Sequence, residues 1–438
     1  MAEKPDHRGL LTRRAALTGL AGAASAAALS GVARTGAASE PGIGPMFSPS
    51  GPDAAHYGAA DGYPISDPKL GFHPGAPLEA KYRVGAFSHG DELFPMLRIA
   101  RAASPWMFKR SQVEIRYHFQ GRPSSLAEYL SRNPVTGLLV AKDDEILFES
   151  YQYARTDRDR FFSGSMAKTI MGMLIGIAVS EGAIKSVDDT PETYVPGFKD
   201  TEYGKTPIRD LLHMSSGVEF GEAENNGRDL DRLWVDMVRG SRIFRKGTIN
   251  SILQFNRRVA APGTRFFYAS IEPDVLSVVL HYAVQKTASD YLQTKVWEPI
   301  GAEADATWLV DAEGFEVAHT HFNAVLRDYA RLGRLFAHDG AWEGKQIIPA
   351  QWMIDATTAR AADAYLAPGR NGPGSFGYGY LIWLLPGARR QFAFISDYGQ
   401  RIFVDPGSKL VMVQTAVETT QKEVFHLWSA LVEQFGER

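Results

Sequence analysis

The pair Ser165 and Lys168 has the residue types and spacing of an activated nucleophile. Residues three apart share one face of a helix, so the hydroxyl and the amine can touch. The stretch from Ser165 to Ala183 is apolar almost all the way round, which predicts a buried helix that stops near Gly182. An amine in apolar surroundings can act as a neutral base and activate a serine without a histidine. Because Ser165 begins this helix, free backbone N–H groups there can also stabilise an oxyanion.

A second copy of the pattern shows how weak the spacing is by itself. Ser66 and Lys69 match it too, but they lie in a loop-like stretch and enclose a proline. Only Ser165 follows a predicted β-hairpin, formed by residues 137–141 and 145–151, and begins an apolar helix. This context favours Ser165 as a nucleophile over a structural serine.

Tyr268 is a second candidate for proton transfer. It ends an apolar run, FFY, and precedes a predicted helix over residues 274–284. A phenol near a lysine can pass protons between nucleophile and leaving group. The three aromatic residues can equally form a core cluster, and Ser270 can equally be the N-cap of the helix. Farther along, residues 396–400 lie between two predicted strands, and a strand edge there can supply a further oxyanion N–H group.

The other elements place strands at both ends of the chain and helices in the middle. Helices are predicted near Asp91 to Ala103 and over 422–435, and helical segments alternate with loops over about 190–375. Strands are predicted, besides the hairpin, over 377–385, 391–396, 400–405 and 409–416. The simplest arrangement is an α+β fold, with one antiparallel sheet built from N- and C-terminal segments, flanked by helices, and a mainly helical insertion beside it. A cleft between sheet and insertion is the expected place for a site.

Composition removes several classes of function. Of 438 residues, 45% are hydrophobic and 22% charged, as in folded globular proteins, and the net charge of -3 gives no excess to bind nucleic acid. The absence of cysteine excludes thiol nucleophiles and disulfides. The sequence contains no Gly-x-Ser-x-Gly elbow, zinc-protease motif or phosphate-binding loop. His319 and His321 offer two imidazoles to a metal, but no carboxylate completes a set, so structural roles are favoured and no metal or cofactor is expected.

The N-terminus has the layout of a twin-arginine export signal, which we assign to residues 1–38. Arg13 and Arg14 precede an apolar run rich in Ala, Gly and Leu, and small residues follow up to Ala38. The run is too short and too weakly hydrophobic for a stable membrane span. We therefore expect the twin-arginine machinery to carry the folded protein to the periplasm or the outside. Residues 39–80 are interpreted as an extended arm or linker, and 81–438 as one domain.

The ordered motifs resemble those of the serine β-lactamase and penicillin-binding-protein superfamily, in its class C β-lactamase-like branch with esterases and 6-aminohexanoate-dimer hydrolases. Ser165-Met166-Ala167-Lys168 matches the Ser-x-x-Lys motif, and Tyr268-Ala269-Ser270 matches the Tyr-x-Asn or Tyr-x-Ser motif. Residues 209–217 and the C-terminal strands up to Pro406 resemble further family stretches, and the likeness covers about 130–435. It implies a β-lactamase/transpeptidase-like fold.

The resemblance also implies a mechanism through an acyl-enzyme on Ser165. Lys168 and Tyr268 would share the proton transfers, and the N–H groups of Ser165 and Asp397 would hold the oxyanion. Ser270 and Tyr398 would complete the substrate-binding site. The expected protein is an exported serine hydrolase that cleaves an amide or ester of a small molecule without a cofactor.

Departures from the family pattern bear on the substrate. The segment from Ser396 to Gly399 replaces a Lys-Thr-Gly-type motif, and Asp397 would repel a substrate carboxylate unless Arg401 offsets it. Tyr398 stands where related amide hydrolases carry histidine, and residues 222–226 lack a tyrosine common in nylon-oligomer hydrolases. A penicillin-recognising D-Ala-D-Ala carboxypeptidase or β-lactamase stays an alternative, as does a non-catalytic binding protein on the same fold.

Overall fold

The computed structural model of the protein describes residues 44–59, 79–111, 113–222, 228–240, 246–311, 313–372, 374–419 and 421–436. The predicted export signal lies outside these residues, and so do residues 60–78 of the predicted arm. No helix in the described part of the chain is long and apolar enough to cross a bilayer.

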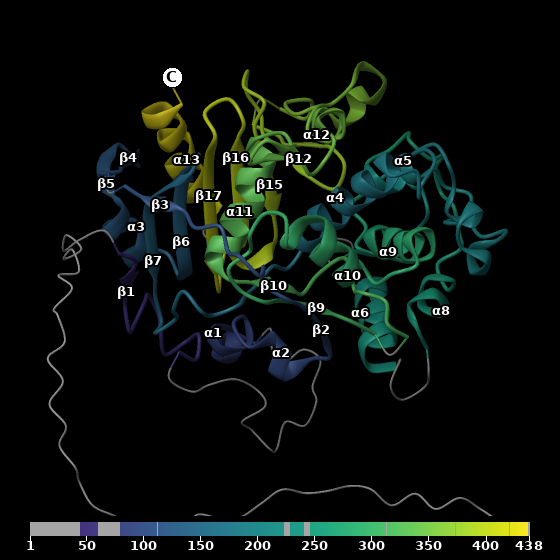
Figure 1. Ribbon diagram of the computed structural model, residues 1–438, viewed down its shortest axis with the longest axis horizontal. Helices are drawn as coiled ribbons and strands as arrows, with labels where there is room; N and C mark the ends of the chain where they lie inside the picture. The colour runs from purple at the N-terminus through teal and green to yellow at the C-terminus, as the bar shows by residue number, and fades with distance from the viewer. Residues whose placement is uncertain are drawn as a thin grey trace, which may run out of the picture. The chain divides into compact units, whose positions relative to one another are not determined.

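A nine-stranded sheet forms one side of the domain, on the left in Figure 1. Its middle is antiparallel and is formed by β6 (Val135–Lys142), β7 (Glu145–Tyr151), β15 (Phe392–Ile395), β16 (Arg401–Asp405) and β17 (Leu410–Ala416). Strand β17 pairs with β6, so segments from both ends of the domain meet in the middle of the sheet. The predicted antiparallel sheet of N- and C-terminal segments is therefore confirmed.

Short strands extend both edges of this sheet. On one side, β14 (Trp383–Leu384) and β13 (Gly377–Tyr378) continue from β15. On the other side, β1 (Met46–Phe47) and β3 (Lys109–Arg110) pair with β7 in parallel. Residues that precede the predicted domain thus take part in its main sheet through β1.

Hydrophobic side chains alternate between the two faces of the sheet. In β17, Val411 and Val413 belong to the core that contains α4 (Met166–Ser180) and α11 (Leu326–Ala337). Leu410 and Met412 belong to the opposite cluster, which includes α3 (Leu126–Arg132) and α13 (Gln421–Phe435). The period-2 alternation of a strand accounts for this division, because successive side chains point to opposite faces.

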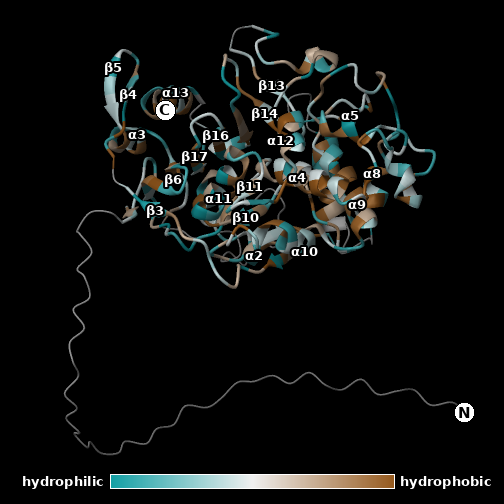
Figure 2. Cartoon of the chain, turned by 45° about the horizontal axis from the view of Figure 1, so that its top comes forward, coloured by the Kyte–Doolittle hydropathy of each residue, from teal (hydrophilic) through white to brown (hydrophobic). Residues whose placement is uncertain are grey.

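The helical region lies beside the sheet, and α4 packs against α9 (Ile271–Val284) within it (Figure 2). It also contributes to a smaller sheet with the order β2 (Met96–Ile99), β9 (Ala306–Leu309), β10 (Phe322–Ala324) and β8 (Phe161–Phe162), which sequence periodicity did not indicate. The remaining short α-helices and strands of the described residues are α1 (Arg83–Ala86), α2 (Gly90–Leu93), β4 (Arg116–Phe119), β5 (Arg122–Ser125), α5 (Ile208–Leu212), α6 (Arg228–Trp234), α8 (Thr248–Ile252), α10 (Ala288–Leu292), β11 (Ala341–Trp342), β12 (Lys345–Gln346) and α12 (Ala350–Ala356).

Two predicted elements are wrong. The helix expected near Asp91 to Ala103 ends at Leu93, because Pro95 interrupts it and the residues that follow pair with β9. The strand expected over 377–385 is two strands joined by a turn. The N–H groups of Tyr380 and Leu381 in that turn donate to carbonyl groups of Ala356 and Leu212, outside the sheet. In both cases, hydrogen bonds to residues that are distant in sequence set the backbone conformation.

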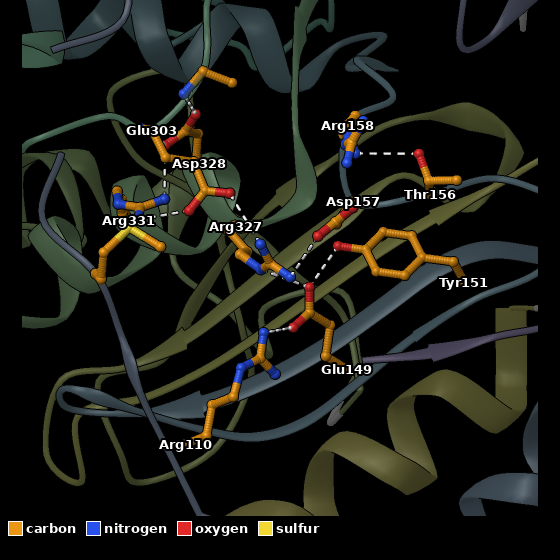
Figure 3. A network of polar contacts seen from close by, with 12 residues as sticks. Arg110, Glu149, Tyr151, Thr156, Asp157, Arg158, Glu303, Arg327, Asp328 and Arg331 are labelled. Atoms are coloured by element: carbon orange, nitrogen blue, oxygen red, sulfur yellow. Dashed lines mark hydrogen bonds and ion pairs between the residues drawn. The ribbon is translucent and has the colours of Figure 1, made fainter. Parts of the chain in front are cut away.

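A buried network of charges joins β7, β3 and α11 (Figure 3). Glu149 accepts hydrogen bonds from the hydroxyl of Tyr151 at 2.6 Å and from Nε of Arg327 at 2.8 Å, and it also pairs with Arg110. The Glu149 side chain has no exposed surface. Arg327 continues the network to Asp157 at 3.0 Å and to Glu303 at 3.2 Å. The network ties an edge of the large sheet to the helix that covers one face of it.

We expect Glu149→Gln to lower the free energy of unfolding by about 3 kcal/mol, because the change removes the fully buried carboxylate that pairs with Arg110 and one of the three that pair with Arg327. Urea denaturation would measure the loss. The matched control is Glu114→Gln, which removes an exposed pair with Arg116 and should leave stability almost unchanged. Equal effects of the two substitutions would contradict this account of the network.

Candidate active site

Ser165 and Lys168 lie together at the start of α4. Ser165 is the N-cap of the helix, and Lys168 Nζ lies 2.7 Å from Ser165 Oγ. Only 1% of the Lys168 surface is exposed, whereas Ser165 is partly exposed. The amine also donates to the backbone carbonyl of His319 at 3.1 Å. The geometry thus brings the hydroxyl of a partly exposed serine and a buried amine into direct contact, as the spacing on one helix face predicted.

The turn before the helix is closely held. Ser163 N–H donates to the carbonyl of Phe322 in β10 at 3.0 Å, and Gly164 has φ +49. A Cβ at Gly164 would lie only 2.0 Å from Oγ of Ser396. Glycine is therefore required at this position by both its backbone conformation and the lack of space.

Tyr268 lies beside the lysine. Lys168 Nζ is 4.9 Å from the centroid of the Tyr268 ring, so the two residues meet through the ring face. The other contacts of the ring are with Trp383, stacked at 5.6 Å between centroids, and with the edge of Tyr378 at 6.2 Å. Full burial raises the pKa of Tyr378 well above its usual value, so that phenol stays neutral. An aromatic wall thus supports Tyr268.

Ser270 has a partner that the sequence did not indicate. Its hydroxyl donates to Glu222 at 2.6 Å, and its N–H donates to the same carboxylate at 3.0 Å. Both residues are buried. The hydroxyl proton of Ser270 is thus directed at Glu222, and the carboxylate fixes the segment that carries Tyr268. No local pattern could have shown this contact, because 48 residues separate the partners.

The proposed oxyanion donors come from two segments. The N–H of Ser165 donates to Oγ of Ser396 at 2.7 Å, so a substrate carbonyl has to displace that hydroxyl to reach it. Asp397 begins a short 3-10 turn, and the N–H group at such a position has no acceptor within its own helix. Arg401 donates to the carbonyl of Ser396 at 2.7 Å, and burial lowers its pKa to about 10. This arginine is therefore engaged with the backbone beside Asp397, whose side chain is exposed.

Tyr398 contacts the N-terminal part of the domain. Its ring lies edge-on to Phe87 at 5.3 Å between centroids, and the guanidinium of Arg83 lies 4.5 Å from its centroid. Burial, as the largest cause, raises the pKa of the Tyr398 phenol. The residue has φ +57, a conformation that few side chains adopt. The segment around residues 83–87 therefore forms part of the surroundings of the site, which its sequence did not indicate.

The two histidines considered as metal ligands have other partners. His319 contacts Asp274 through Nδ1 at 2.7 Å, and His321 contacts the hydroxyl of Thr320 at 2.9 Å. The His321 ring stacks on Trp234 at 5.1 Å between centroids. Within the described residues there is no group of three or more His, Asp or Glu side chains that could hold a metal ion.

Burial, together with the charge of His319, lowers the pKa of His321 to about 3. The unfolded chain binds a proton at this position below about pH 6.5, and the folded chain binds it only below about pH 3. Stability is therefore lost as the pH falls through this interval, by about 1.4 kcal/mol for each pH unit. We expect His321→Asn, which tolerates the observed φ of +54, to flatten this dependence. Urea denaturation at pH 7.5 and 5.5 measures it, and an unchanged difference between the two values would contradict the prediction.

Comparison with known proteins gives the family. The sequence model of the family described as Beta-lactamase matches residues 126–428. A 6-aminohexanoate-dimer hydrolase of Paenarthrobacter ureafaciens is 25% identical over an alignment of 367 residues that covers 82% of this chain and 90% of that protein.

Solved structures share the fold. A Bacillus anthracis protein provisionally assigned as a 6-aminohexanoate-dimer hydrolase superposes with a TM-score of 0.72 at 23% identity, over 82% of this chain and 97% of that one. A family VIII carboxylesterase superposes with a TM-score of 0.51 at 15% identity, over 69% and 93% of the two chains. The β-lactamase/transpeptidase-like fold expected from the motifs is thus confirmed. Because the family match spans more than half of the chain, the protein belongs to the β-lactamase family and is a serine hydrolase.

Proposed function

We propose that the protein cleaves an amide or ester of a small molecule through an acyl-enzyme on Ser165. The observation that carries the proposal is the 2.7 Å contact between Lys168 Nζ and Ser165 Oγ, at a serine that is partly exposed. A buried amine in contact with a serine can take its proton as the oxygen attacks. The names of the Paenarthrobacter and carboxylesterase relatives support amides and esters as the bonds to test.

The proposed reaction has two halves. In the first, Ser165 Oγ bonds to the carbonyl carbon and gives its proton to Lys168. The leaving amine or alcohol then takes a proton from the Lys168 and Tyr268 pair as its bond to carbon breaks. The N–H groups of Ser165 and Asp397 hold the oxyanion, after the carbonyl oxygen displaces the Ser396 hydroxyl. In the second half, water attacks the carbonyl carbon of the ester and gives a proton to the Lys168 and Tyr268 pair. The bond between that carbon and Ser165 Oγ then breaks, the proton passes to Oγ, and the acid leaves.

The charges near the nucleophile bear on the substrate. The Asp397 side chain is exposed, and Arg401 is engaged with the backbone and buried. A carboxylate placed next to Asp397 would meet like charge without a free cation from Arg401. We therefore propose neutral or cationic groups on that side of the substrate, rather than the carboxylate of a penicillin or of a D-Ala-D-Ala peptide.

We expect wild-type protein to form a transient acyl adduct with nitrophenyl acetate and to release nitrophenol. Ser165→Ala should lose the adduct and lower turnover by about 10³-fold or more, because the nucleophile is gone. Intact mass and nitrophenol absorbance measure the two quantities. Ser163→Ala and Ser66→Ala are the controls, since one is the buried neighbour of Ser165 and the other belongs to the second Ser-x-x-Lys copy. An adduct that persists in Ser165→Ala would overturn the assignment.

The same assay distinguishes the alternatives. Ester or amide turnover together with indifference to benzylpenicillin supports a small-molecule amidase or esterase. Stable acylation by benzylpenicillin, or hydrolysis of it, supports a carboxypeptidase or β-lactamase instead. Turnover of the linear 6-aminohexanoate dimer, tested beside the ester, would place the preference with amides.

We also propose export through the twin-arginine route, on the basis of Arg13, Arg14 and the apolar run that follows. We expect replacement of both arginines by lysine to hold the protein in the cytoplasm, because the export machinery recognises the arginine pair. Cell fractionation with immunoblotting measures the distribution, with lysine substitution of Arg8, outside the pair, as the control. Export of the double variant at the wild-type level would contradict this route.

A further inference from the structure

The buried pair Asp274 and His319 lies directly behind the candidate base. One carboxylate holds the histidine at two points, because Asp274 Oδ1 accepts from the backbone N–H of His319 at 3.2 Å and Oδ2 contacts ring Nδ1 at 2.7 Å. The Asp274 side chain has no exposed surface, and that of His319 is 6% exposed. An ionised carboxylate only accepts hydrogen bonds, so Nδ1 carries the proton in this contact.

Holding both the backbone and the ring of His319 fixes the direction of its carbonyl group. That carbonyl accepts a hydrogen bond from Lys168 Nζ at 3.1 Å, and the same amine lies 2.7 Å from Ser165 Oγ. A continuous chain of hydrogen bonds thus runs from Asp274 through the backbone of His319 to Lys168 and to the nucleophile.

The carbonyl of His319 needs this support because it does not belong to a strand. His319 lies in the connection between β9 and β10, whose strands end at Leu309 and begin at Phe322. The lysine amine in turn sits on a flexible four-carbon stem. Without the contacts to Asp274, the His319 carbonyl could shift, and the Lys168 amine that it binds could shift with it. A displacement of about 1 Å between reacting groups can lower the rate by about 10²-fold.

Helix α9 connects the pair of Asp274 and His319 to the Tyr268-Ala269-Ser270 motif. Tyr268 and Ser270 immediately precede the helix, and Asp274 lies in its first turn. One end of α9 therefore places Tyr268 against one side of the lysine, while Asp274 holds the carbonyl on another side. We propose that Asp274 and His319 are positioning residues that hold Lys168 against Ser165, a role that rests on the proposed function of that serine.

The test compares Asp274→Ala with a buried carboxylate that has no contact with the lysine. Glu316→Gln is the matched control, since Glu316 is also buried and also accepts two backbone N–H groups, from Ala288 at 3.1 Å and Ser289 at 2.7 Å. We expect Asp274→Ala to lower kcat for nitrophenyl acetate by about 10- to 100-fold with little change in KM. Glu316→Gln should lower thermal stability and leave kcat close to the wild-type value.

Reaction with a fluorophosphonate probe measures the reactivity of Ser165 Oγ separately from the binding of the ester substrate. Ser165 Oγ bonds to phosphorus, the P–F bond breaks, and fluoride leaves while Lys168 takes the serine proton. Intact mass follows this reaction, which should slow in Asp274→Ala by the same factor as kcat. His319→Asn should keep more of the rate than His319→Ala, because its side-chain amide can donate to Asp274 as Nδ1 does.

The outcomes separate the two proposals. A wild-type protein that neither reacts with the probe at Ser165 nor turns over the ester would overturn the proposed function itself. The positioning role alone would be overturned if the wild type reacts and a folded Asp274→Ala variant has the same kcat and the same rate with the probe as the wild type or as Glu316→Gln. If Asp274→Ala does not fold, the two His319 variants decide, and equal rates for them would count against the proposal.

Discussion

The burial of the Lys168 amine sets the conditions for the whole site. Lys168 lies on an otherwise apolar helix, and a buried polar group has to be compensated by hydrogen bonds. The hydroxyl of Ser165 and the carbonyl of His319 supply hydrogen bonds, and the ring face of Tyr268 covers a further side. These partners come from three separate segments of the chain. Packing of those segments around α4 therefore stabilises the lysine and assembles the chemistry at the same time.

The two sheets bring these segments within reach. Backbone pairing of β8 with β10 holds the turn before the nucleophile, and the hydroxyl of Ser396 binds the N–H of Ser165 from the end of β15. The nucleophile is thus held between the small sheet and the large one. Charge networks such as that of Glu149 tie the large sheet to α11, so the frame around the site is fixed by contacts far from it.

Several polar groups around Ser165 already have hydrogen-bond partners within the protein, and this shapes the chemistry. Glu222 accepts a hydrogen bond from Ser270, and the hydroxyl of Ser396 accepts one from the N–H of Ser165. Arg401 donates to the carbonyl of Ser396. Binding of a substrate carbonyl to the Ser165 N–H therefore exchanges an existing hydrogen bond for a new one. This exchange favours a carbonyl oxygen that becomes negative during the reaction, because charge-assisted hydrogen bonds are stronger than those between neutral groups.

The sequence by itself determined the features that depend on neighbouring residues. These are the buried helix with Ser165 at its start, the contact with Lys168 one turn later, and the alternating strands at both ends of the chain. Tertiary structure alone decided the small sheet, the division of the strand predicted over 377–385 into two, and the partners Glu222, Asp274 and Ser396. These partners lie 48, 45 and 231 residues from the groups that they bind. Hydrophobic periodicity predicts which face of a helix or strand is buried. It does not predict which distant group will bind a given polar atom, because that contact depends on how the whole chain packs.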